Sequence, residues 1–457
     1  ALQDGPPSPA IWHRCGACHH ALGALAQALR CYDEALRLAP DLAEAHNDMG
    51  GVLKLLGRPA EACASFERAL QAKPDLVVAW SNLGNVLREL GRPVEAEKCF
   101  RQAIALQPGF AEAELNLGIV LQARGAGDEA AFFYRQALIH KPVLVQAHNN
   151  LGVLFTERGR HAEAIASFEA ALALQPTFAE AWNNLGNVFK AAGDLEAAME
   201  AFARAVEHRP DYAGAHSNFL FTLNFIDGLP PAQLAEAHRD WGLRHGTPAH
   251  VHTHARQPAG RDRRLKIGYV SPDFRAHACA FFIEPLLREH HRDAVEIYAY
   301  AEIAQPDAVT ARLKGLVDAW RSTTGLPDDQ VAAMIKADGI DIVVDLAGHS
   351  ANNRLLALAR KPAPVQVTYL GYPATTGLAA IDWRLTDAVA EPVGQSEPYY
   401  TERLYRLPHS LWCYQPMPDM PAPGASPALA RGAVKFGSFN SYTKVGPRVV
   451  ALWASVL

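Results

Sequence analysis

The stretch AWSNLGNVLRELGRPVEAEKCFRQAIALQP, residues 79–108, decides the fold of the first half of this sequence because its pattern returns along the chain. Its last residue belongs to a series of prolines spaced 34 residues apart. The series is Pro40, Pro74, Pro108, Pro142, Pro176 and Pro210. A fixed period of this length is typical of arrays in which each copy is one supersecondary unit stacked on the next. We therefore predict a repeat array.

Small and large residues keep fixed places before each proline. An aromatic residue lies eight positions before it, and alanines lie five and twelve positions before it. Glycine holds the place 24 positions before Pro74 and each later proline of the series, at Gly50, Gly84, Gly118, Gly152 and Gly186. This alternation is expected where two antiparallel helices pack closely. It resembles the tetratricopeptide repeat, with six copies over about residues 9–212 and a further helix, and implies an α-solenoid.

One recurring position carries a residue type that is not typical of a protein core. Asparagine occupies it at Asn82, Asn116, Asn150, Asn184 and Asn218, and Asp48 comes before them in the same series at the same 34-residue spacing. Asparagine has poor helix propensity and no apolar surface to bury. One interpretation is that each amide braces a neighbouring helix. The other is a ladder on the concave surface that donates to and accepts from an extended peptide backbone, which would make the repeats a receptor for protein or peptide acceptors.

Composition bounds the class of protein. With 457 residues, 49% of them apolar, the chain can bury a large core in roughly three domains. The net charge of −5 argues against nucleic acid as a partner. No apolar run reaches 18 residues, and residues 1–12 lack the features of a signal peptide, so we expect a cytoplasmic protein without a membrane partner. Seven cysteines without a dense framework fit reduced thiols.

Two histidine-containing segments raise the question of a metal. CGACHH, with Cys15, Cys18 and His19, matches a haem-attachment pattern, but no second C-x-x-C that would complete a zinc site accompanies it, and the repeat explains it as helix. His250, His252 and His254 alternate in a polar stretch without a nearby carboxylate or cysteine, which favours a solvated linker. We therefore expect no metal and no cofactor.

From Leu265 onward, short apolar runs alternate with helical ones. Residues 265–271, 295–302, 340–348, 365–373 and 381–387 are predicted strands, and residues 277–290, 307–320 and 328–339 are predicted helices. This alternation predicts a parallel sheet covered on both faces, with ligands at the carboxyl ends of its strands. The polar stretches SPDFRAH, DLAGHSANNR and LGYPATTG lie at such ends, so three loops should converge on one cleft.

These features divide the chain into four parts. We expect the repeat superhelix over residues 1–226 and a helical connector and linker over 227–264. An α/β lobe should span 265–414, and a Pro-rich linker with the start of a second lobe should follow over 415–457.

Tetratricopeptide repeats followed by GYVSPDFRAH, DLAGHSANNR, LGYPATTG and FNSYTK resemble the O-linked N-acetylglucosamine transferases. The Ala- and Arg-rich composition and SNFLFTLNF, residues 217–225, suggest the bacterial members. The resemblance implies a GT-B fold, two Rossmann-like lobes facing a cleft, and metal-independent, inverting transfer of a sugar from UDP-GlcNAc to Ser or Thr hydroxyls of proteins. It also leaves room for a homodimer formed through the repeats.

The resemblance assigns candidate roles to individual residues. His277 would lie over the reacting centre, either as the base or as a contact to the donor's phosphate and sugar, and Lys444 would meet the β-phosphate of the leaving UDP. Asp345 and His349 would assist or orient, although an aspartate at a strand end also caps helices. The expected donor contacts are Gly371, Tyr372, Pro373, Thr375, Asn440 and Lys444.

The end of the chain limits what this segment is expected to do alone. Only 13 residues follow Lys444, whereas the family's second lobe needs well over a hundred, so we expect the C-terminal part to be incomplete and the activity to belong to the full-length protein. Two alternatives stay open: a member of the same family that transfers fucose from GDP-fucose, and a repeat scaffold without catalysis.

Overall fold

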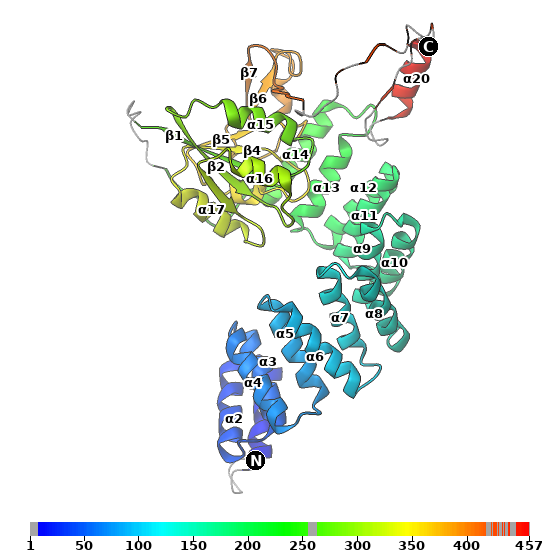
Figure 1. Cartoon of the computed structure of the whole chain (residues 1–457), viewed down its shortest axis with the longest axis vertical. Coiled ribbons are helices and arrows are strands. Elements are labelled where there is room, and N and C mark those ends of the chain that lie inside the picture. Colours follow the sequence, from blue (N-terminus) through cyan, green and yellow to red (C-terminus); the bar gives the residue numbers. More distant parts are fainter. Residues whose placement is uncertain are drawn as a thin grey trace. The chain divides into compact units, whose positions relative to one another are not determined.

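The computed structural model describes residues 8–254, 263–416, 422, 424–426, 428, 432, 434, 437–438 and 445–456. The chain forms two compact units, residues 1–184 and 185–457. The first unit is built of helices, and the second contains the last helices of the array and a parallel sheet, as Figure 1 shows. The predicted fold class, an α-solenoid followed by an α/β lobe, is confirmed.

Antiparallel helix pairs make up the first unit. Their bounds are α1 (Pro9–Ala21), α2 (Leu25–Leu38), α3 (Ala43–Leu55), α4 (Pro59–Ala72), α5 (Val77–Glu89), α6 (Pro93–Leu106), α7 (Ala111–Ala123), α8 (Gly127–His140), α9 (Val145–Glu157) and α10 (His161–Leu174). The array continues through α11 (Ala179–Ala192), within which the two units meet, to α12 (Leu195–His208), α13 (Ala213–Leu223) and α14 (Pro231–His245).

The recurring glycines and aromatics explain how each pair packs. Phe66 of α4 is 1% exposed, and a Cβ atom added to Gly50 of α3 would lie 2.7 Å from its ring. The same approach recurs between Gly84 and Phe100 and between Gly152 and Phe168. Glycine is therefore required here by the space that the ring fills, which is the packing role that the sequence pattern predicts.

A seven-stranded sheet forms the centre of the second unit. Its strands are β1 (Leu265–Ser271), β2 (Val295–Ala301), β3 (Ala319–Ser322), β4 (Ile342–Asp345), β5 (Val365–Thr368), β6 (Trp383–Asp387) and β7 (Arg403–Leu407). They lie in the order β3-β2-β1-β4-β5-β6-β7, and every pair is parallel. In register, Ile267 of β1 lies opposite Ile297 of β2 on one side and Ile342 of β4 on the other.

Helices cover both faces of this sheet. The remaining helices are α15 (Ala280–Glu289), α16 (Ala308–Lys314), α17 (Asp328–Ala337), α18 (Leu355–Leu358), the 3-10 turn η1 (Glu397–Tyr399) and α20 (Pro447–Val456). Residues of α15 and α16 pack with Tyr269 and Ile297 on one face. Residues of α17 and α18 pack with Val270 on the other face, and Leu220 of α13 and Trp241 of α14 join the same core. The last helices of the array thus help to bury the sheet.

The structure corrects two details of the predicted elements. The helix expected over 307–320 ends at Lys314, because Ala319–Ser322 pairs with β2 as the edge strand β3. The predicted strands also omit β7, which forms the opposite edge of the sheet. The other predicted strands and helices of the lobe form close to their expected places.

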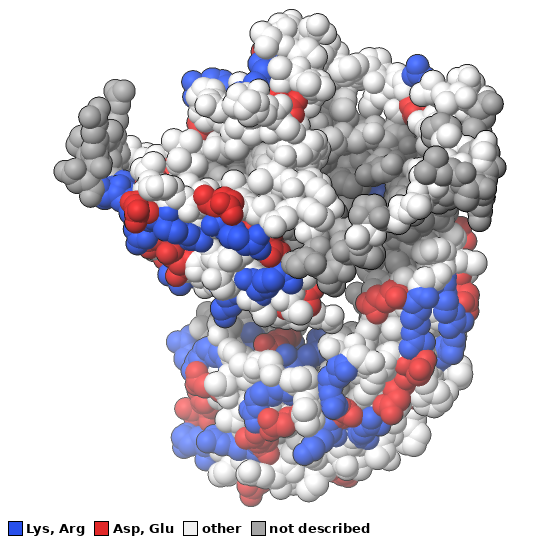
Figure 2. Space-filling model, turned by 45° about the horizontal axis from the view of Figure 1, so that its top comes forward, with Lys and Arg blue, Asp and Glu red and all other residues white. Residues whose placement is uncertain are grey.

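Charge and hydropathy of the described residues agree with this architecture. No described helix is long and apolar enough to cross a membrane. On the face shown in Figure 2, basic and acidic residues are interspersed. Ion pairs within one helical turn, such as Arg92–Glu95 and Arg160–Glu163, recur at the start of the second helix of a repeat.

Candidate functional site

The order of the strands places a ligand crevice next to β1. Its chain neighbour β2 lies on one side and β4 lies on the other, so the connections that leave β1 and β4 run to opposite sides of the sheet. A crevice forms at the carboxyl ends of strands where the order reverses in this way. The stretches SPDFRAH and DLAGHSANNR are the loops that follow these two strands.

A pocket of about 970 Å³ opens at this point. The loops after β1, β4 and β5 contribute to its wall, as the sequence analysis predicts for the three polar stretches. Residues of α11, α13 and α15 complete it. Among its lining residues are Asp273, His277, Asn218, Lys190, Asn352 and Gly371. One predicted catalytic residue, one predicted donor contact and one asparagine of the ladder therefore line the same cavity.

His277 lies in the loop between β1 and α15, and its side chain is 40% exposed. Its Nδ1 atom accepts a hydrogen bond from the Cys279 backbone N–H at 3.3 Å and lies 3.6 Å from Asp273 Oδ2. Burial raises the pKa of the Asp273 carboxyl, and the nearby His277 acts to lower it. Contacts with the protein thus engage Nδ1 of the ring, so Nε2 is the nitrogen that can contact a ligand.

Asp345 organises the turn after β4. Its buried carboxylate accepts hydrogen bonds from the backbone N–H groups of Ala347 (3.1 Å) and Gly348 (2.9 Å) and from the Thr368 hydroxyl of β5 (2.9 Å). Burial raises its pKa despite these bonds. The structure therefore places Asp345 behind the loop that lines the pocket, where it fixes the backbone.

His349 lies in a buried cluster beneath the pocket. Its Nε2 contacts the Thr376 carbonyl at 2.8 Å, which requires a donated proton, so Nδ1 accepts from the Ser217 hydroxyl at 3.0 Å. The ring packs edge-on against Trp241. Burial lowers the pKa of His349 well below its ordinary value and keeps it neutral. Both nitrogens are thus engaged with the protein, and the structure does not bring His349 to the pocket wall.

Tyr372 belongs to the same cluster. Its hydroxyl contacts His238 Nε2 at 2.7 Å and accepts from Asn224 Nδ2 at 2.9 Å. Because His238 Nδ1 donates to the Leu234 carbonyl, Nε2 is the acceptor for the tyrosine proton. Burial lowers the pKa of His238 to about 4. Tyr372 is 2% exposed and joins α13 and α14 to the lobe.

The remaining predicted donor contacts are divided between pocket and core. Gly371 lines the pocket, and a Cβ atom there would lie 1.9 Å from the Leu346 carbonyl oxygen, so only glycine fits. Pro373 is exposed and lines a neighbouring cavity together with Gly371. Thr375 is buried, and its hydroxyl donates to Glu402 Oε2 at 2.6 Å. Asn440 and Lys444 lie outside the described residues.

The predicted asparagine ladder is half-buried at equivalent places of α5, α7, α9, α11 and α13. Two of its members are braced by an asparagine of the preceding repeat. Asn82 Nδ2 donates to Asn47 Oδ1 and Asn184 Nδ2 donates to Asn149 Oδ1, both at 3.1 Å. Bracing of this kind is one of the two interpretations left open by the sequence, and it also fixes the amides in one orientation. On α3, where Asp48 holds the equivalent place, the carboxylate instead contacts His13 Nε2 at 2.8 Å.

Three features of the pocket escaped the sequence analysis. Lys190 lies near the rings of Phe202 and Phe221, and burial lowers its pKa. Asn352 and Leu370 adopt positive φ angles of 58° and 73°, which cost about 1–3 kcal/mol each for residues other than glycine. Such strain clusters at functional sites. Lys190 occupies the place that Lys54 and Arg88 hold in earlier repeats, a recurrence that the sequence analysis did not follow. Backbone angles of this kind leave no trace in the residue types.

The pocket also contains residue types that bind metals. Asp273, His277 and Cys279 each place one ligand atom within 4.8 Å of the others. Burial raises the pKa of the Cys279 thiol to about 12.

Comparison with known proteins identifies the domains. Residues 237–416 match Glycosyl transferase family 41, and tetratricopeptide repeat families match several segments between residues 16 and 212. Fold and pocket thus define a tetratricopeptide repeat array followed by an α/β domain that matches glycosyl transferase family 41.

Individual relatives agree. The probable UDP-N-acetylglucosamine–peptide N-acetylglucosaminyltransferase SPINDLY of Hordeum vulgare is 40% identical over 244 residues, 52% of this chain and 26% of its own length. The Arabidopsis thaliana protein SEC, named for the same activity, is 32% identical over 47% of this chain and 23% of its own length. The chain therefore matches about a quarter of the length of these curated relatives.

A solved structure extends the similarity to both domains. A lysine-to-methionine mutant of the Thermobaculum terrenum O-GlcNAc transferase superposes with a TM-score of 0.69 and 37% identity, covering 76% of this chain and 66% of the other. The chain is therefore homologous to SPINDLY and to O-GlcNAc transferases.

Proposed function

We propose that this chain is part of a protein O-GlcNAc transferase, which moves N-acetylglucosamine from UDP-GlcNAc to Ser or Thr hydroxyls of proteins. One observation carries the proposal: His277 and Asn218 line one pocket at the strand crossover. A family 41 domain and relatives named for this activity support the assignment of the reaction class.

The proposed reaction is a single displacement with inversion. The acceptor oxygen forms a bond to the anomeric carbon while the bond from that carbon to the diphosphate oxygen breaks and its electron pair leaves with UDP. The hydroxyl proton passes to a base or to a phosphate oxygen. Such a reaction needs stabilisation of the charge that grows on the diphosphate, which we assign to Lys444 and to backbone N–H groups near the pocket.

The hydrogen bond at Nδ1 of His277 supports one of its two proposed roles. The Cys279 N–H donates to Nδ1, which places the proton of a neutral ring on Nε2. That tautomer donates from Nε2 to an oxygen of the donor rather than accepting the hydroxyl proton. We therefore propose that His277 orients the sugar or phosphate of the donor.

On the acceptor side, the asparagines would hold a peptide by its backbone. Amides present a donor and an acceptor at once, and the bracing by Asn47 and Asn149 gives them a fixed orientation before the peptide arrives. Asn218 would be the last of these contacts before the reacting hydroxyl.

Incubation of the full-length protein with labelled UDP-GlcNAc or labelled GDP-fucose tests the proposal. Sugar transfer to protein, or hydrolysis, with UDP-GlcNAc is the expected result. If only GDP-fucose is turned over, the protein is still a glycosyltransferase, but its donor is GDP-fucose rather than UDP-GlcNAc. Absence of turnover with both would favour the repeat scaffold.

The proposed transfer uses no metal, because side chains and backbone dipoles neutralise the diphosphate. Activity should therefore survive dialysis against a chelator. Loss of activity that a divalent cation restores would contradict this part of the proposal and direct attention to Asp273, His277 and Cys279. We also propose a cytoplasmic location, a bacterial source and a dimer formed through the repeats.

A further inference from the structure

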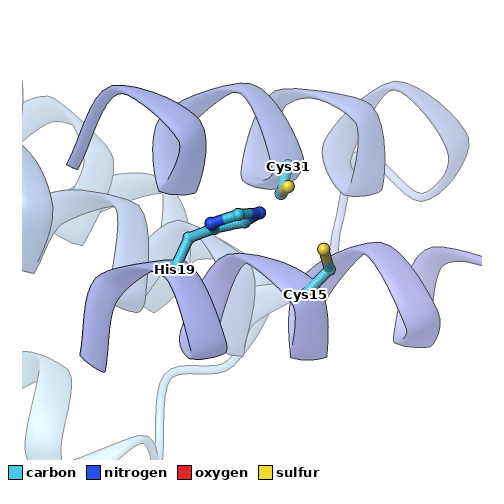
Figure 3. A group of neighbouring side chains, drawn as sticks. All are labelled: Cys15, His19 and Cys31. Atoms are coloured by element: carbon cyan, nitrogen blue, oxygen red, sulfur yellow. The ribbon is translucent and has the colours of Figure 1, made fainter. Parts of the chain in front are cut away.

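The first repeat contains a cluster of metal-ligating side chains far along the chain from the pocket. Cys15 and His19 lie one turn apart on the same face of α1, and Cys31 lies on α2. Their ligand atoms all lie within 4.8 Å of one another. Figure 3 shows the three side chains projecting into the space between the two helices.

The other repeats serve as an internal control for this cluster. At intervals of 34 residues, the place of Cys15 is taken by Met49, Leu83, Leu117, Leu151 and Leu185. The place of His19 is taken by Leu53, Leu87, Leu121, Phe155 and Phe189. Leu53 and Leu87 are 6% and 3% exposed, so this place belongs to the helix–helix core. Only the first of the six copies exchanges both apolar residues for ligands.

The surroundings of the cluster favour a soft cation. Cys31 is 6% exposed, and its thiol lies close enough to Cys15 to share a hydrogen bond. Gly16, next to Cys15, allows the same close approach of helices as in the other repeats, since a Cβ atom there would lie 2.5 Å from the Tyr32 ring. Two sulfur atoms and one imidazole are the ligand types of zinc, and three protein ligands leave its fourth position to water.

We propose that Cys15, His19 and Cys31 bind one Zn²⁺ ion, which joins the two helices of the first repeat. Tetrahedral zinc sets its sulfur and nitrogen ligands about 3.5–3.8 Å apart, so small rotamer changes bring these atoms to binding distance. The sequence motif suggested Cys15, Cys18 and His19 as ligands. In the structure, Cys31 of α2 takes the place of Cys18 in this set. This site is independent of the proposed transferase activity.

Zinc titration of the full chain, reduced with a phosphine and competed with a chromophoric chelator, tests the site. We expect one equivalent of Zn²⁺, with Co²⁺ giving the sulfur-to-metal and ligand-field bands of a tetrahedral thiolate site. Affinity should rise with pH, because zinc binding displaces the thiol protons.

Variants separate loss of a ligand from loss of the fold. Cys15→Leu and His19→Leu install the residue types of the other repeats, and Cys31→Ser installs the residue found at Ser65 and Ser167, so all three should fold. Each should weaken zinc binding by about 100-fold and abolish the zinc-dependent rise in Tm. Cys18→Ser, on the exposed side of α1, should bind as the parent does.

Two results would overturn the proposal. One is a reduced chain that takes up no zinc in competition with a chelator of micromolar affinity. The other is an equal loss of binding in Cys18→Ser, which would show that the metal is held by the C-x-x-C pattern instead.

Discussion

The repeats and the α/β lobe differ in how often each candidate functional residue occurs. In the first unit, four asparagines occupy the same place in successive repeats, and at least two are held by the same kind of bond. In the second unit, the pocket is built once, from loops after β1, β4 and β5 and from neighbouring helices. A ladder is redundant, whereas each pocket residue has no equivalent. Loss of one pocket residue should therefore cost far more than loss of one ladder residue.

The largest effect is expected at His277. His277→Ala should lower transfer by roughly 10²-fold or more, because the donor loses its oriented contact, while Tm stays unchanged since the side chain is 40% exposed. Steady-state kinetics of the full-length protein and a melting curve measure both. His291→Ala, at an exposed histidine of the same lobe, is the matched control.

His277→Gln sharpens the same test. Glutamine keeps a hydrogen-bond donor but is no base, so it should retain more activity than alanine if His277 contacts the donor. Equal inactivation by both substitutions would assign the base role, and a near-normal rate for His277→Ala would remove His277 from the mechanism.

Acid should destabilise the second unit. The pKa of His238 is about 4 in the folded chain and about 6.5 when unfolded, because burial disfavours the charged ring. A depressed pKa gives stability that is present above pH 6.5 and lost as pH falls to 4, amounting to about 3 kcal/mol for this group. His216 shifts to about 4 as well, and His349 shifts in the same direction.

Melting curves between pH 7.5 and 4 check this prediction. His238→Gln should melt with a shallower pH dependence, whatever its stability at neutral pH. The same slope in parent and variant would show that His238 is not buried in neutral form.

Two adjacent glycines of α3 test the repeat packing. Gly50→Ala should lower stability by about 1–3 kcal/mol, because the new Cβ would lie 2.7 Å from the Phe66 ring. Gly51→Ala, with no atom within 4 Å, should raise it by up to about 1 kcal/mol, since alanine favours helix. Chemical denaturation measures both, and the same sign for the two substitutions would contradict the packing described for this pair.

The smallest effect is expected for a single ladder residue. Asn116→Ala should remove about 1 kcal/mol of peptide hydrogen bonding, or about a fivefold rise in KM for protein acceptors. Donor hydrolysis should stay unchanged. Gln102→Ala, an exposed amide on the second helix of a repeat, should change neither.

The triple variant Asn150→Ala, Asn184→Ala and Asn218→Ala should raise KM for protein acceptors by the product of the single effects. Donor hydrolysis should stay unchanged. If both activities fall together, the substitutions have damaged the solenoid rather than the peptide contacts.

The sequence was sufficient for the central strands but not for the edges of the sheet. The strands at the centre are continuous apolar runs, since both of their faces are covered by helices. The edge strands β3 and β7 are partly exposed, and charged residues interrupt their sequences AWRS and RLYRL. The helix predicted over 307–320 therefore absorbed the start of β3.

The candidate site divides in the same way. His277 and Gly371 could be placed at the pocket because they follow strands, and parallel strands end at one edge. His349 and Thr375 also follow strands, yet their side chains turn into the core, where Ser217, Thr376 and Glu402 bind them. Residue type and position in the sequence do not show that these side chains point into the core, because their direction depends on partners up to 132 residues away.

By itself, the sequence determined the solenoid, the parallel sheet and the loops that form the pocket, because the 34-residue period and the alternation of apolar runs with helical segments are patterns within the sequence itself. Tertiary structure alone decided which side chains of those loops reach the pocket. It also brought Lys190 beside Phe221 and Cys31 beside Cys15 and His19. These contacts join residues on different helices, and helix packing fixes them only once the chain has folded.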